Sequence, residues 1–395
     1  MSLLGAVQKG VMQAAFKPRR AYPFRRGFWC IALLVALLAS GVGTAAAQQR
    51  CATPPGFPNP GFLDAMQRGV NLPGWDVPDI AQRPQRSQLQ VLRQEGFGHI
   101  RLPLDNRRLA GAEGPDYVAA IYDEVINLLS LGFVVSLDLH ADRKVGDLFR
   151  EQPQQGEAYL DDLWQRLLPM VSILEPSKVA VELLNEPQID QDRWMAVAER
   201  LVGRIRATLS EHTIIVGPAG PQRHEMLSGM APFADRNIVY AVHYYDPFLF
   251  THQGATWGAP DDPLRYLRGL PFPAAKEDLT VASILKELHA QGREDAALDL
   301  VRSLHNDWNE KMIAQAFDVM AGWAAKYQRP VIINEFGVLS YNAPRDARLR
   351  WLGAVNRLAT ERCLGWAHWD FKDGFGLVDP ATGLPDRDVM RALAR

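Results

Sequence analysis

The chain has 395 residues, of which 47% are hydrophobic and 22% are charged, and its formal net charge is −2. This composition is typical of a folded globular protein and excludes a disordered or collagen-like chain. The balance of 43 basic against 45 acidic residues does not indicate nucleic-acid binding, and three cysteines are too few for a disulfide-rich scaffold. The length would accommodate a single α/β barrel, which takes about 250 residues or more.

The N-terminal segment has the three parts of a secretory signal. Residues 1–27 carry six basic and no acidic residues, an apolar run covers 28–39, and three alanines at 45–47 precede Gln48. This order predicts a signal peptide over 1–47, cleaved after Ala47, and a mature domain over 48–395. An uncleaved membrane anchor is the alternative because 27–49 holds no charge, but its glycines and alanines make a poor span.

Removal of this segment changes the net charge. The mature chain keeps 37 basic and 45 acidic residues, a net charge of −8, which favours an uncharged partner over nucleic acid or an anionic membrane. We expect a secreted or periplasmic monomer with no stable membrane association. Cys30 leaves with the signal, so that Cys51 and Cys363 either form one disulfide or remain two buried thiols.

The rest of the chain alternates strands and helices. Short apolar runs predict eight strands, over 68–72, 99–103, 133–139, 179–184, 213–217, 237–242, 330–334 and 364–369. Helical periodicity predicts helices over 85–95, 116–130, 157–175, 190–210, 221–229, 309–327 and 345–360. Eight strand–helix units predict an α/β fold, a single (β/α)8 TIM barrel. A doubly wound open sheet is the alternative, but no glycine-rich phosphate loop follows the first strand.

One connection is much longer than the others. Between the sixth strand and its helix, residues 246–308 contain four prolines over 260–273 and a helical stretch near 278–304. An insertion after a barrel strand lies on the face that carries active sites, so this segment could shape a substrate cleft. It could equally be peripheral to the site.

Side chains at the carboxyl ends of barrel strands share one cavity. The residues at these ends are Asn71, Arg101, His140, Asn185, Glu186, His243, Tyr245, Glu335 and Trp369. Glu186 and Glu335 follow the fourth and seventh strands, so we expect them to face each other across the barrel mouth. Two carboxyl groups about 5 Å apart are the equipment of a retaining glycosidase, in which one attacks the sugar and the other protonates the leaving oxygen.

Two motifs carry a specific resemblance. Leu183-Leu-Asn-Glu-Pro187 and Ile332-Ile-Asn-Glu-Phe-Gly337 resemble the acid/base and nucleophile signatures of glycoside hydrolase family 5, whose members are retaining (β/α)8 glycosidases. Further matches, in the family's order over roughly 60–390, are Arg68-Gly-Val-Asn-Leu72, Ile100-Arg-Leu-Pro103, Asp138-Leu-His140, His243-Tyr-Tyr245 and Trp369. A lone Asn-Glu-Pro is common by chance, whereas seven ordered motifs at seven strand ends are not.

The resemblance implies a role for each residue. Glu335 would be the nucleophile, kept ionised by Arg101, and Glu186 the acid/base, which needs a raised pKa in the free enzyme. The remaining substrate-binding residues would be Asn185 for the sugar 2-hydroxyl, Tyr245 as a donor to Glu335, His243 to orient Glu186 or Tyr245, His140 for another hydroxyl, and Trp369 as a stacking platform. Further platform candidates are Trp75, Trp257, Phe371 and Phe375.

The substrate implied is a neutral β-linked polysaccharide, and an endo-β-1,4-glucanase is favoured. The alternatives are a β-mannanase, an exo-β-1,3-glucanase, or a barrel that binds polysaccharide without cleaving it, although no catalytic position is missing. We expect no metal and no cofactor, because His224-Glu225 lacks the second histidine of a zinc-protease motif. Taken singly, each site residue also has a structural explanation, such as a helix start at Glu186-Pro187 or a salt bridge between Arg101 and Glu335.

Overall fold

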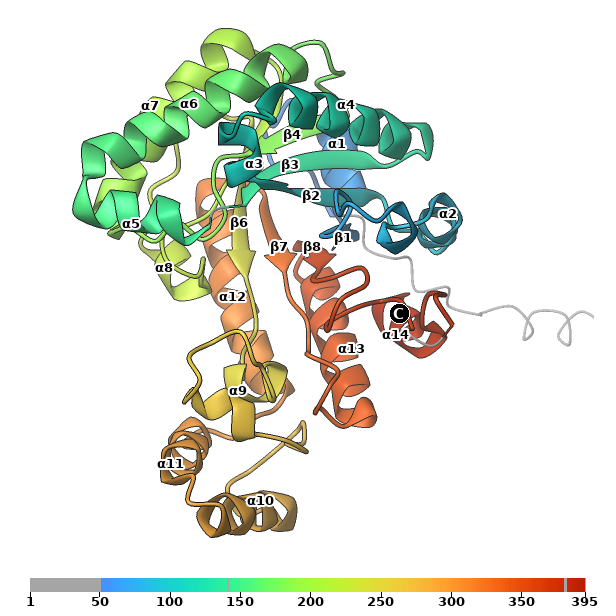
Figure 1. The fold of residues 1–395 in the computed structure, drawn as a ribbon, viewed down its shortest axis with the longest axis vertical. Helices are drawn as coiled ribbons and strands as arrows, with labels where there is room; N and C mark the ends of the chain where they lie inside the picture. The colour runs from blue at the N-terminus through green and yellow to red at the C-terminus, as the bar shows by residue number, and fades with distance from the viewer. Residues whose placement is uncertain (1–50, 141, 380–381, 395) are drawn as a thin grey trace, which may run out of the picture. The chain divides into compact units, whose positions relative to one another are not determined.

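Eight parallel strands form a closed barrel in which β1 pairs with both β2 and β8 (Figure 1). The computed structural model describes residues 51–140, 142–379 and 382–394, so the expected signal segment lies outside the described residues. The strands are β1 (Gly69–Asn71), β2 (His99–Asp105), β3 (Val134–His140), β4 (Val179–Glu182), β5 (Thr213–Val216), β6 (Ile238–His243), β7 (Val331–Glu335) and β8 (Gly365–His368). The predicted barrel is confirmed, and every strand begins and ends within two residues of its expected position.

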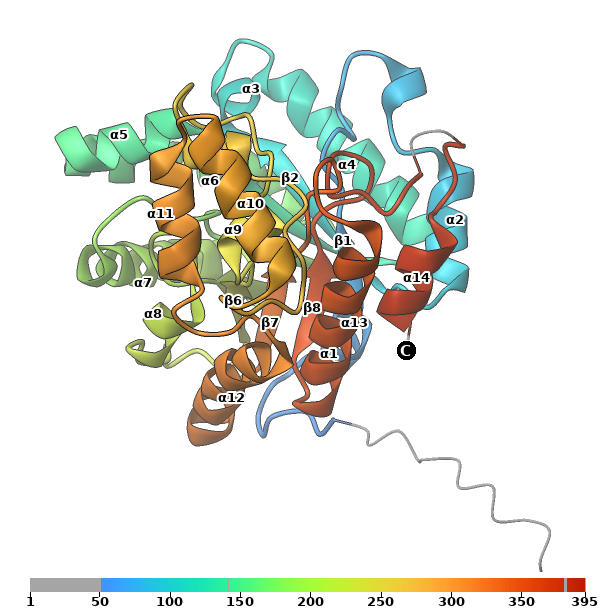
Figure 2. The same ribbon diagram turned by 90° about the horizontal axis from the view of Figure 1, so that it is seen from below.

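Helices surround the barrel (Figure 2). Those that were predicted are α2 (Arg86–Gln94), α4 (Gly114–Ser130), α6 (Pro153–Val171), α7 (Gln191–Thr208), α8 (His224–Ser228), α12 (Glu310–Tyr327) and α13 (Arg345–Glu361). The sequence reasoning missed α1 (Pro60–Ala65), α3 (Asn106–Ala110), α5 (Arg143–Glu151), α9 (Phe248–Thr251) and α14 (Arg387–Ala394). Each missed helix is short, and helical periodicity needs about eleven residues to become visible.

The strands are apolar because helices and barrel interior bury both of their faces. At the amino end of the barrel, α1 inserts Phe62 and Met66 against Val239 and Ile332. This helix begins at Asn59, whose side chain accepts a hydrogen bond from the backbone NH of Phe62 and thereby caps the first turn. The amino end is therefore filled with side chains, and the carboxyl ends of the strands remain for a site.

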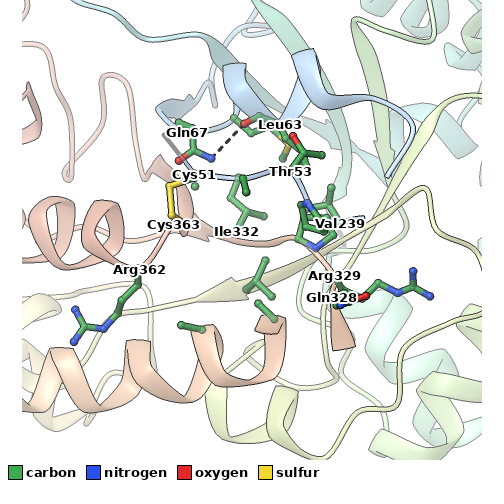
Figure 3. A pocket seen from close by; sticks show the side chains of 18 of the residues that line it. Cys51, Thr53, Leu63, Gln67, Val239, Gln328, Arg329, Ile332, Arg362 and Cys363 are labelled. Atoms are coloured by element: carbon green, nitrogen blue, oxygen red, sulfur yellow. Dashed lines mark hydrogen bonds between the residues drawn. A yellow bond between two sulfur atoms is a disulfide. The ribbon is translucent and has the colours of Figure 1, made fainter. Parts of the chain in front are cut away.

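A disulfide joins Cys51 to Cys363, with Cα atoms 5.4 Å apart and a sequence separation of 312. It connects the segment before α1 to the turn between α13 and β8, and it lies beside a cavity of about 310 Å³ (Figure 3). Val239 and Ile332, near the starts of β6 and β7, line this cavity. The cavity therefore belongs to the amino end of the barrel, where packing rather than chemistry is expected.

The long insertion forms a helical subassembly after β6. It contains α9, a 3-10 turn over Pro263–Tyr266, α10 (Leu279–Ala290) and α11 (Glu294–Ser303), which matches the predicted helical stretch. In Figure 1 these helices lie beyond the arrowheads of β6 and β7, at the carboxyl ends of the strands. Trp308 closes the insertion: it is 1% exposed and pairs through its backbone with Ala274. Among the residues described, no helix is long and apolar enough to cross a bilayer.

Candidate active site

The structure gathers all eight predicted site residues at the carboxyl end of the barrel. Arg101 lies within β2, His140 ends β3, His243 ends β6 and Glu335 ends β7. The other four, which stand in the loops directly after β4, β6 and β8, are Asn185, Glu186, Tyr245 and Trp369. The structure therefore places these eight side chains at one end of the barrel, and six of them line a common cavity there.

Arg101 is the centre of a buried charge network. Its side chain is 0% exposed and its guanidinium contacts three carboxylates: Glu182 at 2.7 Å, Glu335 at 2.5 Å and Asp138 at 3.0 Å. The same guanidinium donates to the side-chain oxygen of Asn185 at 2.8 Å. Burial by itself lowers the pKa of Arg101, but the three carboxylates outweigh it and raise this pKa well above its ordinary value. The arginine is thus a permanent cation beside Glu335.

Sequence reasoning missed the role of Glu182. Its carboxylate takes two hydrogen bonds from Arg101, and its Oε1 also accepts one from the side-chain amide of Asn334 at 2.9 Å. Burial raises the pKa of Glu182. The signal was present: one acidic residue in the otherwise apolar run 179–184 of a barrel strand must find a buried cation.

The carboxylate of Glu335 is held at both oxygens. Oε1 accepts from Arg101, and Oε2 accepts from the hydroxyl of Tyr245 at 3.1 Å. Burial raises the pKa of Tyr245 well above its ordinary value, so the phenol stays a neutral donor. These contacts hold Glu335 in one orientation at the cavity floor, as the predicted donor role of Tyr245 requires.

Glu186 faces the cavity from the other side. Its Oε1 lies 2.9 Å from Nδ1 of His243, and this nitrogen lies 3.4 Å from Oε2 of Glu335. One side-chain atom of each of these three residues lies within 4.8 Å of the others. Glu186 also has a φ of +41°, a conformation that costs free energy for a residue with a side chain and is found mostly at functional sites.

The expected raised pKa of Glu186 is not found in this structure. Burial acts to raise it, but the hydrogen bond from His243 and the positive charges of His243, His140 and Arg101 outweigh burial and lower the pKa. The family resemblance indicated that His243 would orient Glu186 or Tyr245, but not that its hydrogen bond would lower the pKa of Glu186.

His140 links the charge network to the platform residue. Its Nδ1 lies 2.8 Å from Asp138, and its ring stacks on Trp369 with centroids 5.6 Å apart and an interplanar angle of 18°. Burial acts to lower the pKa of His140, but the charge and hydrogen bond of Asp138 outweigh it and raise the pKa. Asp138 thus orients both Arg101 and His140.

These residues border a cavity of about 530 Å³ above Glu186 and Glu335. Its lining comprises His140, Asn185, Glu186, Tyr245, His252, Thr256, Trp257, Glu335, Leu339, Tyr341, Trp369, Asp370, Asp373, Gly374 and Phe375. A second cavity of about 340 Å³ shares His140 and Trp369 with it and extends toward Asp105 and Asp142. Together they make a site that continues on both sides of Trp369.

The platform candidates divide into two groups. Trp257, which is 64% exposed, and Phe375 line the cavity. Trp75 and Phe371 do not line it: both are buried, and Trp75 donates to the backbone of Pro103 and stacks on Tyr117. These two belong to the core, as the packing alternative proposes. Tyr341, which is 70% exposed in the lining, was missed because no strand end or motif marks it.

Two groups of side chains in the described part of the chain could offer three metal ligands. Glu186, His243 and Glu335 form one, and His224, Glu225 and Asp246 form the other. In the first group the atoms bond to one another and to Arg101 and Tyr245. In the second, Arg223 forms ion pairs with both carboxylates. A cation would have to displace these partners.

Comparison with known proteins agrees with this geometry. The family model described as cellulase (glycosyl hydrolase family 5) matches residues 63–374. The chain belongs to this family. It is therefore a glycoside hydrolase, and Glu186 and Glu335 lie at the carboxyl ends of its barrel strands.

Several curated relatives carry the name endoglucanase. The chain is 25% identical over 338 residues to endoglucanase 3 of Fibrobacter succinogenes, covering 80% of this chain and 50% of that protein. It is 26% identical over 362 residues to endoglucanase C of Acetivibrio thermocellus, covering 84% of this chain and 98% of that protein. The chain thus spans half of the Fibrobacter relative and nearly all of the Acetivibrio one.

Solved structures share the fold. Endoglucanase Cel5A of Thermotoga maritima superposes with a TM-score of 0.67 at 23% identity, covering 84% of this chain and 98% of that one. The cellulose synthase subunit Z of Clostridioides difficile superposes with a TM-score of 0.66 at 24% identity, covering 84% of this chain and 100% of that one.

Proposed function

We propose that this family 5 hydrolase is an exported endo-β-1,4-glucanase that cleaves a neutral β-glucan with retention of anomeric configuration. The observation that carries the proposal is the pair Glu186 and Glu335, with side-chain oxygens within 4.8 Å of one another above a shared cavity. Retaining enzymes hold their carboxyl groups about 5 Å apart, whereas inverting enzymes leave about 6.5–9.5 Å for a water molecule.

In the first step Glu335 attacks the anomeric carbon while Glu186 donates its proton to the departing glycosidic oxygen. A bond forms between the sugar and a carboxylate oxygen of Glu335, and the bond to the leaving sugar breaks. Arg101 and Tyr245 hold the carboxylate of Glu335 oriented for this attack. In the second step Glu186, now a carboxylate, takes a proton from water, which attacks the same carbon and releases Glu335.

The other residues bind and orient the substrate. Asn185, held by Arg101, is placed for the sugar 2-hydroxyl, and His243 bridges toward both catalytic carboxylates. The Trp369 indole offers an apolar face to a pyranose, and the stacked His140 stands beside it for a hydroxyl group. Trp257 offers a second exposed face across the cavity.

Cleavage inside a polysaccharide requires a cleft that continues on both sides of the reacting sugar. The 530 Å³ cavity reaches Trp257 and Tyr341 on one side, and the 340 Å³ cavity continues past Trp369 on the other. Two relatives, from Fibrobacter and Acetivibrio, carry the endoglucanase name. An endo-acting β-1,4-glucanase fits both observations.

Export rests on two features of the chain. Residues 1–47 have the composition of a signal peptide, and the structure joins Cys51 to Cys363, a bond that persists in oxidising compartments. We propose that the mature enzyme comprises 48–395, is secreted or periplasmic, and acts as a monomer without membrane association. Thiol titration of the exported protein, unfolded without reductant, should find no free thiol; two free thiols would contradict this part of the proposal.

The decisive assay measures reducing sugar released from carboxymethylcellulose, mixed-linkage glucan, laminarin, mannan and xyloglucan. We expect the first two to be cleaved, with a rapid fall in viscosity, and Glu335→Gln to abolish turnover on all. Mannan is the second candidate because a Thermotoga maritima Cel5A structure contains mannotriose, and bacterial cellulose is worth adding because the Clostridioides protein is a cellulose synthase subunit. Binding without hydrolysis across the panel would favour a non-catalytic barrel.

A further inference from the structure

One buried carboxyl group in the catalytic cavity takes no part in the displacement reaction. Asp370 follows Trp369 directly and is only 2% exposed, yet it lines the 530 Å³ cavity. Its Oδ1 has no hydrogen-bond partner, and it is the only such buried side-chain atom among the described residues that line this cavity. An unsatisfied polar atom beside a ligand cavity costs free energy, and a ligand can relieve that cost.

The charges around Asp370 favour its protonated form. Asp373 of the same loop and Glu335 of β7 are both anionic neighbours, and the Tyr245 hydroxyl after β6 is neutral. Arg348 of α13 is the nearby cation, but its guanidinium donates to backbone oxygens. Burial, the largest effect, and the charge of Asp373 raise the pKa of Asp370 to about 8, and they outweigh the backbone hydrogen bond from Asp373 and the charge of Arg348, which lower it.

A protonated carboxyl group suits a sugar better than a carboxylate would at this position. It both donates and accepts hydrogen bonds, as a sugar hydroxyl does, whereas a carboxylate only accepts. A neutral group also avoids placing a further negative charge near the attacking carboxylate of Glu335. Since Asp370 is the residue next to Trp369, its carboxyl group lies at the side of the stacking platform.

We propose that Asp370 is a substrate-binding residue whose carboxyl group hydrogen-bonds a hydroxyl group of the sugar unit that lies against Trp369. This inference rests on the proposed function, because it requires a glucan in the cavity. It assigns to Asp370 a selective role, since only a sugar with a hydroxyl group in the matching position satisfies the buried oxygen.

The test measures the affinity of a thio-linked cello-oligosaccharide, which the enzyme does not hydrolyse, by calorimetry between pH 5 and pH 9. Wild-type affinity should fall about tenfold as the pH rises through about 8, because the ionised group no longer donates. Asp370→Asn keeps a donor and an acceptor and should lose this fall. Asp370→Ala should bind about tenfold more weakly than the wild type at pH 6. The comparison with the Asn variant separates Asp370 from His140, which both proteins retain.

Asp373→Asn is the matched control, because Asp373 is an exposed residue of the same loop. This variant should move the fall in affinity to lower pH, since the charge of Asp373 raises the pKa of Asp370. Wild-type affinity that is constant from pH 5 to pH 9, or an Ala variant that binds as tightly as wild type, would overturn the role of Asp370. No binding by the wild type at any pH would instead overturn the proposed function.

Discussion

The substitution Glu182→Gln tests whether the buried charge network positions the catalytic pair. Glu182 is 0% exposed and offers both oxygens to Arg101, one of them shared with Asn334. Glutamine has nearly the same shape, but it replaces one oxygen with an NH2 group. In either orientation of the amide, that group faces an N–H of Arg101, so that one hydrogen bond is lost and two donors oppose each other.

The expected loss of stability follows from the remaining partners. Breaking a buried ion pair by removing one partner costs about 3–5 kcal/mol. Arg101 keeps Asp138 and Glu335, so we expect the lower value, about 3 kcal/mol, in the free energy of unfolding. For a domain of this size that corresponds to a fall in Tm of roughly 4 °C. The displaced guanidinium should also disturb Glu335 and Asn185 and lower kcat/KM at least about tenfold.

Urea unfolding at pH 7.5 and kcat/KM on a soluble glucan provide the measurements. Glu157→Gln is the control, because Glu157 forms an exposed ion pair with Arg200 and its loss should cost no more than about 1 kcal/mol. If Glu182→Gln unfolds within about 0.5 kcal/mol of wild type and keeps its kcat/KM, the network does not position the site.

Five further substitutions address the catalytic acid, its histidine partner, the buried acid, the platform and the core. Glu186→Ala should slow glucan hydrolysis far more than hydrolysis of aryl glycosides with good leaving groups, and azide should partly restore activity; equal losses would exclude an acid/base role. His243→Phe removes the hydrogen bond that lowers the pKa of Glu186, so the alkaline limb of kcat/KM should move to higher pH; an unchanged or lower limb would contradict this. Folding raises the pKa of Asp370 from 3.8 to about 8, so the native state keeps its proton to higher pH than the unfolded state does. The free energy of unfolding should therefore fall by a few kcal/mol as the pH rises between these values. Asp370→Asn should remove this fall, and parallel curves of stability against pH for the two proteins would contradict the prediction. Trp257→Ala should raise KM for long glucans with little effect on Tm, because Trp257 is exposed. Trp75→Ala should lower Tm by several degrees, because Trp75 is buried. If Trp257→Ala lowers Tm and leaves KM unchanged, Trp257 is a packing residue.

Sequence patterns predicted the barrel closely, because buried parallel strands are short apolar runs and the covering helices have one apolar face. Barrel enzymes carry their active sites at the carboxyl ends of the strands, so the positions of the strands in the sequence were enough to predict where the site lies. The short helices α3 and α5 were missed because too few residues show a period, although they stand on the loops after β2 and β3 beside the site.

The hydrogen-bond partners and burial of each candidate site residue were harder to predict. Glu186 and His243 are 57 residues apart in sequence. The family resemblance indicated that His243 would orient Glu186 or Tyr245, but not that their hydrogen bond would lower a pKa that was expected to be raised. The same holds for Trp75 and Phe371, aromatic residues near strand ends that the fold turns into the core. The local sequence pattern does not predict whether a loop side chain points into the core or into the cavity.

The sequence by itself determined the fold class and the family and marked Glu186 and Glu335 as the candidate catalytic carboxyl groups, because these depend on periodicity, strand order and local motifs. Only the tertiary structure decided which charges meet: three carboxylates at Arg101, a histidine at Glu186, and an unpartnered acid at Asp370. The physical reason is that electrostatic interactions and desolvation depend on distance and burial in space, and residues from different strands acquire both only when the barrel closes.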